Sequence, residues 1–287
     1  MIATQTHPAA VTTPNFLYIG TSKAGSTWIY GILSQHPQAF MATGKGLYFF
    51  DGHYDRGIPW YQSCFAEAAG QPVVGEISHS YLFSVDACTR ISQLDPEMKL
   101  MVCFREPAER AFSAYLDGVK NGQIDCTFEE ALEKAPSLID RGRYATHLRP
   151  YLETFGSERI HVGVFDELAS DPERFASRIF EFLGIQPVSL PTSQSKKMMP
   201  AARPRSYALA QWAKKASVAA KTVGLRKLRS RVKRSRLIRN MLYRSYSAKD
   251  KPVMSQSTRS DLRERFAGEV YALDRMLGSS FARTWGY

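Results

Sequence analysis

Apolar residues follow two patterns along the chain, and the two patterns alternate. Short runs rich in aromatic and β-branched residues predict buried strands, at residues 15–20, 72–78, 98–104 and 158–165. Apolar residues at helical spacing predict amphipathic helices, at residues 25–37, 107–122, 171–185 and 255–278. Because strands that alternate with helices build a parallel sheet covered on both faces, we predict an α/β fold, a P-loop-like three-layer sandwich around a central, mostly parallel sheet.

The same pattern predicts a single domain over residues 1–287, in three stretches. Residues 1–14 are expected to form a flexible arm, and residues 15–195 the α/β core. From residue 196 to 287 the pattern becomes helical and basic, so we expect a helical C-terminal extension rather than a second domain. The first residues lack the basic and apolar regions of a secretory signal, and no apolar run is long enough to span a bilayer. A cytoplasmic protein is therefore expected.

Charge is distributed unevenly along the chain. There are 38 Lys and Arg against 27 Asp and Glu, a formal net charge of +11. Residues 182–249 contain 17 of the basic residues and none of the acidic ones, so the remainder of the chain is net negative. The basic stretch 214–244 can attract an anionic membrane surface, or it can be a solvated helical face beside a bound anion. Since no aromatic or base-reading pattern accompanies it, nucleic acid is disfavoured as a partner.

A glycine loop joins the first predicted strand to its helix in the stretch FLYIGTSKAGSTW. Gly20 and Gly25 have the separation of a Walker A loop, but Ser26 stands where that loop has its lysine, and the lysine here is Lys23. Main-chain N–H groups of such a loop and the positive end of the helix dipole bind phosphate or sulfate. The hydroxyls of Ser26 and Thr27 can add donors. Spacing alone also fits a tight turn without a ligand.

A second anion-binding pattern follows the third predicted strand. Arg105 comes directly after the run KLMVCF, and Ser113 follows eight residues later in the next helix. Ligands of open α/β sheets sit outside the carboxyl ends of the strands, so Arg105 is placed to bind a phosphate through two hydrogen bonds, with Ser113 adding a hydroxyl. The alternative is an ordinary ion pair of Arg105 with Glu106 or Glu109.

Together these stretches resemble the sulfotransferases that use 3′-phosphoadenosine 5′-phosphosulfate (PAPS). TSKAGSTW is similar to their 5′-phosphosulfate loop, and FREPAERAFSAY to their 3′-phosphate segment. Further segments are similar, in the same order, to the heparan sulfate N- and 3-O-sulfotransferases, namely LSQHPQAF, YFFDGHYDRGIPWY, GEISHSYLF and RYATHLRPYLETFGSERIHVGVFDEL. The resemblance implies in-line transfer of a sulfuryl group from PAPS to a hydroxyl, or to an amine, of a carbohydrate-like or glycolipid acceptor. PAP would be released, and no metal would be needed.

The resemblance also implies roles for individual residues. Lys23 would lie over the bridging oxygen and stabilise charge on the departing phosphate. Arg105 and Ser113 would hold the 3′-phosphate, and Tyr144 would line the acceptor cleft. The other expected PAPS-binding residues lie in the loop after the first strand or in a later basic run, and they are Ala24, Gly25, Ser26, Thr27, Trp28, Lys196 and Arg203.

The general base departs from the family pattern. Heparan-type relatives carry a Glu two residues before a His in the segment that corresponds to KGLYFFD, where this chain has Gly46 and Tyr48. The acceptor must still lose a proton, which a carboxylate or an imidazole normally takes. His79 is the expected base, with Glu76 or Asp51 orienting it or acting in its place; the alternative for His79 is a polar loop residue.

Three alternative functions stay open. A changed base is consistent with a changed acceptor, such as a small secondary metabolite. A P-loop nucleotide hydrolase or kinase would need a lysine in place of Ser26 and an acid after the third strand, which instead runs into Arg105. A non-catalytic protein of the same fold would bind PAPS without transfer. The four cysteines lack CxxC spacing and indicate neither a zinc site nor a disulfide framework.

Overall fold

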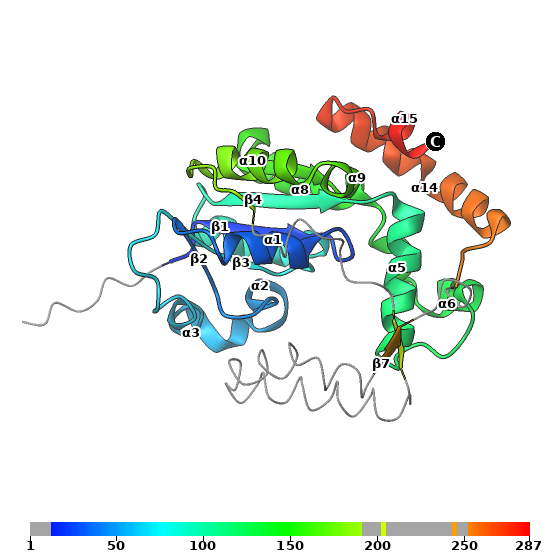
Figure 1. Ribbon diagram of the computed structural model, residues 1–287, viewed down its shortest axis with the longest axis horizontal. Helices are drawn as coiled ribbons and strands as arrows, with labels where there is room; N and C mark the ends of the chain where they lie inside the picture. Colours follow the sequence, from blue (N-terminus) through cyan, green and yellow to red (C-terminus); the bar gives the residue numbers. More distant parts are fainter. Residues whose placement is uncertain (1–12, 191–201, 205–242, 246–251) are drawn as a thin grey trace, which may run out of the picture.

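A computed structural model describes residues 13–190, 202–204, 243–245 and 252–287. Five parallel strands form one sheet in the order β2-β3-β1-β4-β5 (Figure 1). They are β1 (Phe16–Gly20), β2 (Ala39–Met41), β3 (Val73–Ile77), β4 (Lys99–Phe104) and β5 (Ile160–Val164). The four predicted strands are confirmed, and the short edge strand β2 is an addition. Because β1 lies between β3 and β4, the carboxyl ends of these three strands lie next to one another.

Helices cover both faces of the sheet, which confirms the predicted three layers. One face is covered by α1 (Ser26–Leu33), α9 (Phe165–Ser170) and α10 (Pro172–Leu183). The other face is covered by α2 (Phe49–Gly52), α3 (Gly57–Ser63), α4 (Val85–Leu94), α5 (Pro107–Lys120), α6 (Phe128–Lys134), α8 (Tyr144–Phe155), α14 (Gln256–Leu277) and α15 (Phe281–Trp285). The short helix α7 (Ser137–Asp140) and three 3₁₀ turns, at Tyr54–Arg56, Tyr81–Phe83 and Ser157–Arg159, complete the helical elements of the described residues.

The central strand shows why both faces must be covered. Phe16 and Tyr18 of β1 point into the core beneath α1 and α10, while Leu17 and Ile19 point into the opposite core. All four side chains are at most 1% exposed. Successive side chains of a strand alternate between faces, so a strand that is apolar at every position is buried on both sides.

The C-terminal part returns to the sheet through α14. Leu262, Phe266, Val270 and Leu273 are buried in the same core as α5 and α8, as their helical spacing predicts. Beside α5 lies a ribbon that the sequence did not predict, because helix was expected there: the antiparallel strands β6 (Ala202–Pro204) and β7 (Tyr243–Ser245) (Figure 1). Arg203 belongs to β6.

Several predictions lie outside the described residues. They concern Lys196, most of the basic stretch 214–244, and the arm at residues 1–12.

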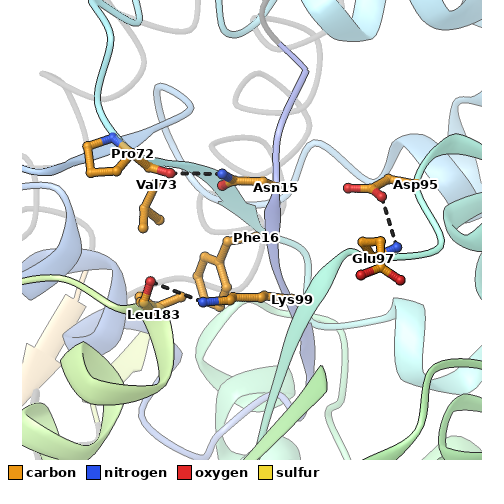
Figure 2. A pocket seen from close by; sticks show the side chains of 8 residues that line it. All are labelled: Asn15, Phe16, Pro72, Val73, Asp95, Glu97, Lys99 and Leu183. Atoms are coloured by element: carbon orange, nitrogen blue, oxygen red, sulfur yellow. Dashed lines mark hydrogen bonds between the residues drawn. The ribbon is translucent and has the colours of Figure 1, made fainter. Parts of the chain in front are cut away.

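A hollow of about 260 Å³ opens at the amino ends of the strands (Figure 2). Its polar groups are already paired within the protein: the Asn15 amide donates to the Pro72 carbonyl at 2.8 Å, and Lys99 Nζ donates to the Leu183 carbonyl at 3.2 Å. Asn15 precedes β1 and Lys99 begins β4, so this hollow lies at the edge of the sheet opposite the glycine loop. The candidate chemistry gathers at the other edge.

Candidate active site

The glycine loop is fixed against the neighbouring strand β4. The main-chain N–H and the hydroxyl of Thr21 both donate to the Cys103 carbonyl, at 3.2 and 3.0 Å. Gly25 has a φ of 93°, and a Cβ there would lie 2.5 Å from Leu168, so only glycine fits. Lys23 also takes a left-handed conformation, with a φ of 71°. These contacts and left-handed residues define the turn from β1 into α1, and no side chain caps this helix.

Two lysines bring positive charge to this loop. Lys45, from the segment after β2, donates to Ser26 Oγ at 3.3 Å and to Thr27 Oγ1 at 2.5 Å. An ammonium group thus reaches Ser26, the position that holds the lysine in a Walker A loop. Lys23 Nζ lies 3.3 Å from a carboxylate oxygen of Asp117, on α5. Sequence reasoning missed Lys45 and Asp117, because both meet the loop only through the fold.

Arg105 lies at the end of β4 and is held from several sides. Its Nη2 is 3.2 Å from Glu109, whose other oxygen is 2.7 Å from Arg259 of α14. Its guanidinium carbon lies 4.8 Å from the ring centre of Phe165. The ion pair with Glu109 considered from the sequence is therefore present, and it fixes the guanidinium at the carboxyl edge of the sheet. Ser113 is half-buried on α5.

His79 follows β3 and contacts Tyr48. Its Nε2 lies 2.8 Å from the Tyr48 hydroxyl, and the two rings pack edge to face at 5.4 Å. Burial, and after it the charges of Lys45 and Arg141, lower the pKa of His79 to about 4. A smaller effect of Lys23 acts in the same direction. The imidazole is therefore neutral near pH 7, as a proton acceptor must be.

A comparison with known protein families gives the family of the chain. Residues 13–242 match the sulfotransferase domain family. The chain belongs to the sulfotransferase family.

This sulfotransferase is similar to curated relatives over part of their length. It is 30% identical over 182 residues to human heparan sulfate glucosamine 3-O-sulfotransferase 3B1, a match that covers 60% of this chain and 46% of the relative. It is 28% identical over 196 residues to mouse bifunctional heparan sulfate N-deacetylase/N-sulfotransferase 4, covering 61% and 22%. The chain thus spans less than half the length of these relatives.

Solved structures show the same fold. The sulfotransferase from Alicyclobacillus acidocaldarius superposes with a TM-score of 0.71 at 23% identity, over 96% of this chain and 100% of that one. Mouse sulfotransferase SULT7A1, solved in complex with PAP, superposes with a TM-score of 0.55 at 13% identity, over 95% and 87%. At these identities the likeness concerns the fold.

The structure contradicts the expected roles of Glu76. This sulfotransferase buries the side chain of Glu76 to 1% exposure among donors from Leu47, Ser78 and two tyrosines. Burial raises its pKa, and these hydrogen bonds oppose the rise. An acceptor cannot reach a carboxylate enclosed in this way, and none of these contacts orients His79. Glu76 instead ties the segment around Leu47 to the end of β3.

Asp51 does not orient His79 either. One of its oxygens accepts from the hydroxyl of Ser80, and the other is buried without a partner among the described residues.

Three other predicted site residues are buried. Tyr144 is 1% exposed, stacks on Phe104 at 4.5 Å and donates its hydroxyl to the Arg105 carbonyl at 2.8 Å. The predicted acceptor contact of Tyr144 is therefore wrong, and its role is to support Arg105. Trp28 packs edge-on against Phe175 and is 7% exposed. Ala24 is fully buried, so it can offer a ligand only main-chain groups.

Within the described ranges, no cluster of three or more His, Cys, Asp or Glu side chains could hold a metal ion. No helix in the same ranges is both long enough and apolar enough to cross a membrane.

Proposed function

We propose that this sulfotransferase moves the sulfuryl group of PAPS to a hydroxyl of a carbohydrate-like acceptor and releases PAP. The observation that carries the proposal is the Lys45 ammonium group at the start of α1, which no side chain caps, together with Lys23 in the loop that leads into this helix. The first N–H groups of a helix have no intrahelical partner and point at a bound anion. The two lysines, these N–H groups and the hydroxyls of Ser26 and Thr27 together fit the phosphate and the sulfate of one phosphosulfate.

The second half of the cofactor site fits a separate phosphate. Arg105 follows β4 and lies beside the strand that leads into the loop, so the two anion sites share one edge of the sheet. Its guanidinium, with the Ser113 hydroxyl on the adjacent helix, suits the 3′-phosphate of PAPS. Arg203 stays a candidate for the same nucleotide because β6 lies beside α5, which carries Ser113.

The chemistry follows from where charge develops. As the sulfuryl group leaves, negative charge grows on the bridging oxygen, and Lys23 is the proposed group that stabilises it. Lys45 would stabilise the negative charge on the oxygens of the sulfuryl group during its transfer. Charge stabilisation of this kind often supplies most of an enzyme's rate enhancement. His79, neutral at pH 7, would receive the acceptor's proton.

The acceptor is proposed from the relatives and from charge. Two relatives are named for heparan sulfate, one as a 3-O- and one as an N-sulfotransferase. We favour a saccharide hydroxyl, with an amine as the alternative. A third relative, 29% identical over 136 residues, is named a membrane-associated sulfotransferase, from Dictyostelium discoideum. The basic stretch 214–244 would suit a glycolipid on an anionic membrane surface.

The test is a transfer assay with PAPS labelled with ³⁵S in the sulfuryl group. The full chain is incubated with labelled PAPS and, separately, with heparosan, lipid-linked saccharides and a phenolic metabolite set. The proposal predicts label in a saccharide-containing product and equimolar PAP. Label only in the phenols would favour a metabolite acceptor. Turnover of Mg·ATP with no use of PAPS would favour a nucleotide hydrolase and overturn the proposal.

A further inference from the structure

Tyr48 occupies a specific place in the site. It has a φ of 53°, a left-handed conformation that is costly for a bulky residue, and its main-chain N–H donates to Ser78 Oγ at 3.0 Å. Its ring lies directly over Gly46: a Cβ at position 46 would be 2.6 Å from Tyr48 Cε2. The surrounding contacts thus hold the hydroxyl of Tyr48 toward His79.

The two ring nitrogens of His79 differ in their surroundings. Its Nδ1 is buried and has no hydrogen-bond partner among the described residues. Its Nε2 lies 2.8 Å from the Tyr48 hydroxyl, so the remaining nitrogen is already covered. Tyr48 itself is half-buried, so part of it is open to solvent. The hydrogen bond between Tyr48 and Nε2 therefore gives a proton from the acceptor a route to the imidazole through the phenol.

The surroundings of this pair connect it to the phosphosulfate loop. The positive charge of Lys45 lowers the pKa of His79, and the same ammonium group contacts Ser26 and Thr27 at the start of α1. The charges of Lys23 and of Arg141, from the segment before α8, also lower the pKa of His79. The Tyr48–His79 pair thus lies on the loop side of β3, where an acceptor must meet the sulfuryl group.

The geometry points to Tyr48 as a catalytic residue, a proton relay between the acceptor hydroxyl and His79. This inference rests on the proposed sulfuryl transfer and names the route of its proton. The acceptor oxygen forms the new O–S bond, and its proton passes to Tyr48 Oη while the proton of Tyr48 passes to His79 Nε2. The S–O bond to PAP breaks, and its electron pair stays on the phosphate oxygen beside Lys23. The products are the sulfate ester, PAP and a His79 imidazolium that later releases its proton to solvent.

The first test reads the protonation of His79 in the PAP-bound full chain by ¹⁵N NMR of the imidazole. The signal is assigned by its loss in His79→Gln. A relay requires a neutral ring with hydrogen on Nδ1 and none on Nε2. A ring with hydrogen on Nε2 would donate to Tyr48 and could not receive its proton, which would overturn the inference.

The second test compares Tyr48→Phe with Tyr30→Phe in the transfer assay. Tyr30 is a matched control because its hydroxyl holds the other end of the same segment, accepting from the Gly44 N–H at 2.9 Å. Tyr48→Phe keeps the ring over Gly46 and should lower kcat about 100-fold, the usual worth of a positioned proton acceptor. PAP affinity should not change, and Tyr30→Phe should stay near wild type.

The pH profile separates a relay from a structural role. In the wild type, kcat should fall in acid as His79 becomes protonated, and in Tyr48→Phe this fall should vanish because His79 no longer serves the acceptor. A Tyr48→Phe enzyme with wild-type kcat and the same acid limb would overturn the relay alone. If the wild type itself transfers no sulfuryl group, the proposed function fails instead.

Discussion

The ring of Tyr48 fills the space that a side chain at position 46 would occupy. A Cβ on Gly46 would lie 2.6 and 2.7 Å from two ring atoms of Tyr48 and 2.9 Å from its hydroxyl oxygen, and Gly46 has a φ of 76°. The two departures from the family's Glu-x-His pattern are therefore linked physically. Glycine at 46 and tyrosine at 48 form one arrangement, in which the hydroxyl of Tyr48 reaches His79.

Restoring the family glutamate alone should therefore be harmful. Gly46→Glu forces the Tyr48 ring away from His79, and we expect kcat to fall about 100-fold because the proton acceptor is lost. The double variant Gly46→Glu with Tyr48→His removes the ring and supplies the family pair, so it should be more active than Gly46→Glu. Steady-state transfer rates with PAPS and the identified acceptor measure both. Full activity in Gly46→Glu would show that the two positions are independent.

Asp117 competes with the phosphosulfate for Lys23. The two groups lie 3.3 Å apart, and both are partly exposed, so the pair is weak and salt-screened. Asp117→Asn should tighten PAP binding by a few-fold at low salt, and the gain should shrink at high salt. Isothermal titration calorimetry at low and high salt measures the PAP affinity. Asp86→Asn is the control, because it removes the same charge from a remote pair with Arg90; an equal effect of both variants would contradict a local role.

Arg105 should recognise the 3′-phosphate and nothing else of the nucleotide. Arg105→Ala should weaken PAP binding by about 10- to 100-fold, the worth of a hydrogen bond to a charged group. It should leave the affinity for AMP, which lacks that phosphate, near wild type. Lys23→Ala should weaken both ligands, since both carry the 5′-phosphate. If Arg105→Ala weakened the binding of PAP and of AMP equally, this would contradict a contact between Arg105 and the 3′-phosphate.

His79 should titrate far below the usual range of histidine. With a pKa of about 4, the ring is neutral from pH 5 upward and gains its proton only in acid. Activity should therefore be lost as pH falls through about 4, and folding stability tied to this ring should be lost between pH 6.5 and 4. Three cations, Lys45, Arg141 and Lys23, and the Tyr48 hydroxyl face the ring. Lys45→Met should raise the pH midpoint of the His79 titration measured by NMR. An unchanged midpoint would contradict the electrostatic effect of Lys45 on His79.

The sequence predicted those parts of the molecule that neighbouring residues determine. The four main strands, the loop around Lys23 and the position of Arg105 follow from local runs of residues. β2 was missed because three residues carry no readable alternation. β6 and β7 form a ribbon where helix was expected, because two segments far apart in the chain pair with each other. Such pairing cannot be read from the periodicity of either segment.

The errors within the site have the same origin. Lys45 was missed because its contact with Ser26 and Thr27 spans 18 or more residues. Tyr144 was expected in the acceptor cleft, but tertiary packing against Phe104 buries it. Lys45 is the first residue of the segment KGLYFFD, and this was the one available signal that it belonged to the site.

The most direct test of sulfuryl transfer is the ³⁵S transfer rate of Lys23→Ala beside the wild type, at saturating PAPS. If Lys23 stabilises the charge on the leaving phosphate, kcat falls by at least about 100-fold, while circular dichroism and thermal unfolding stay unchanged. Undiminished transfer by a folded Lys23→Ala enzyme would contradict the mechanism.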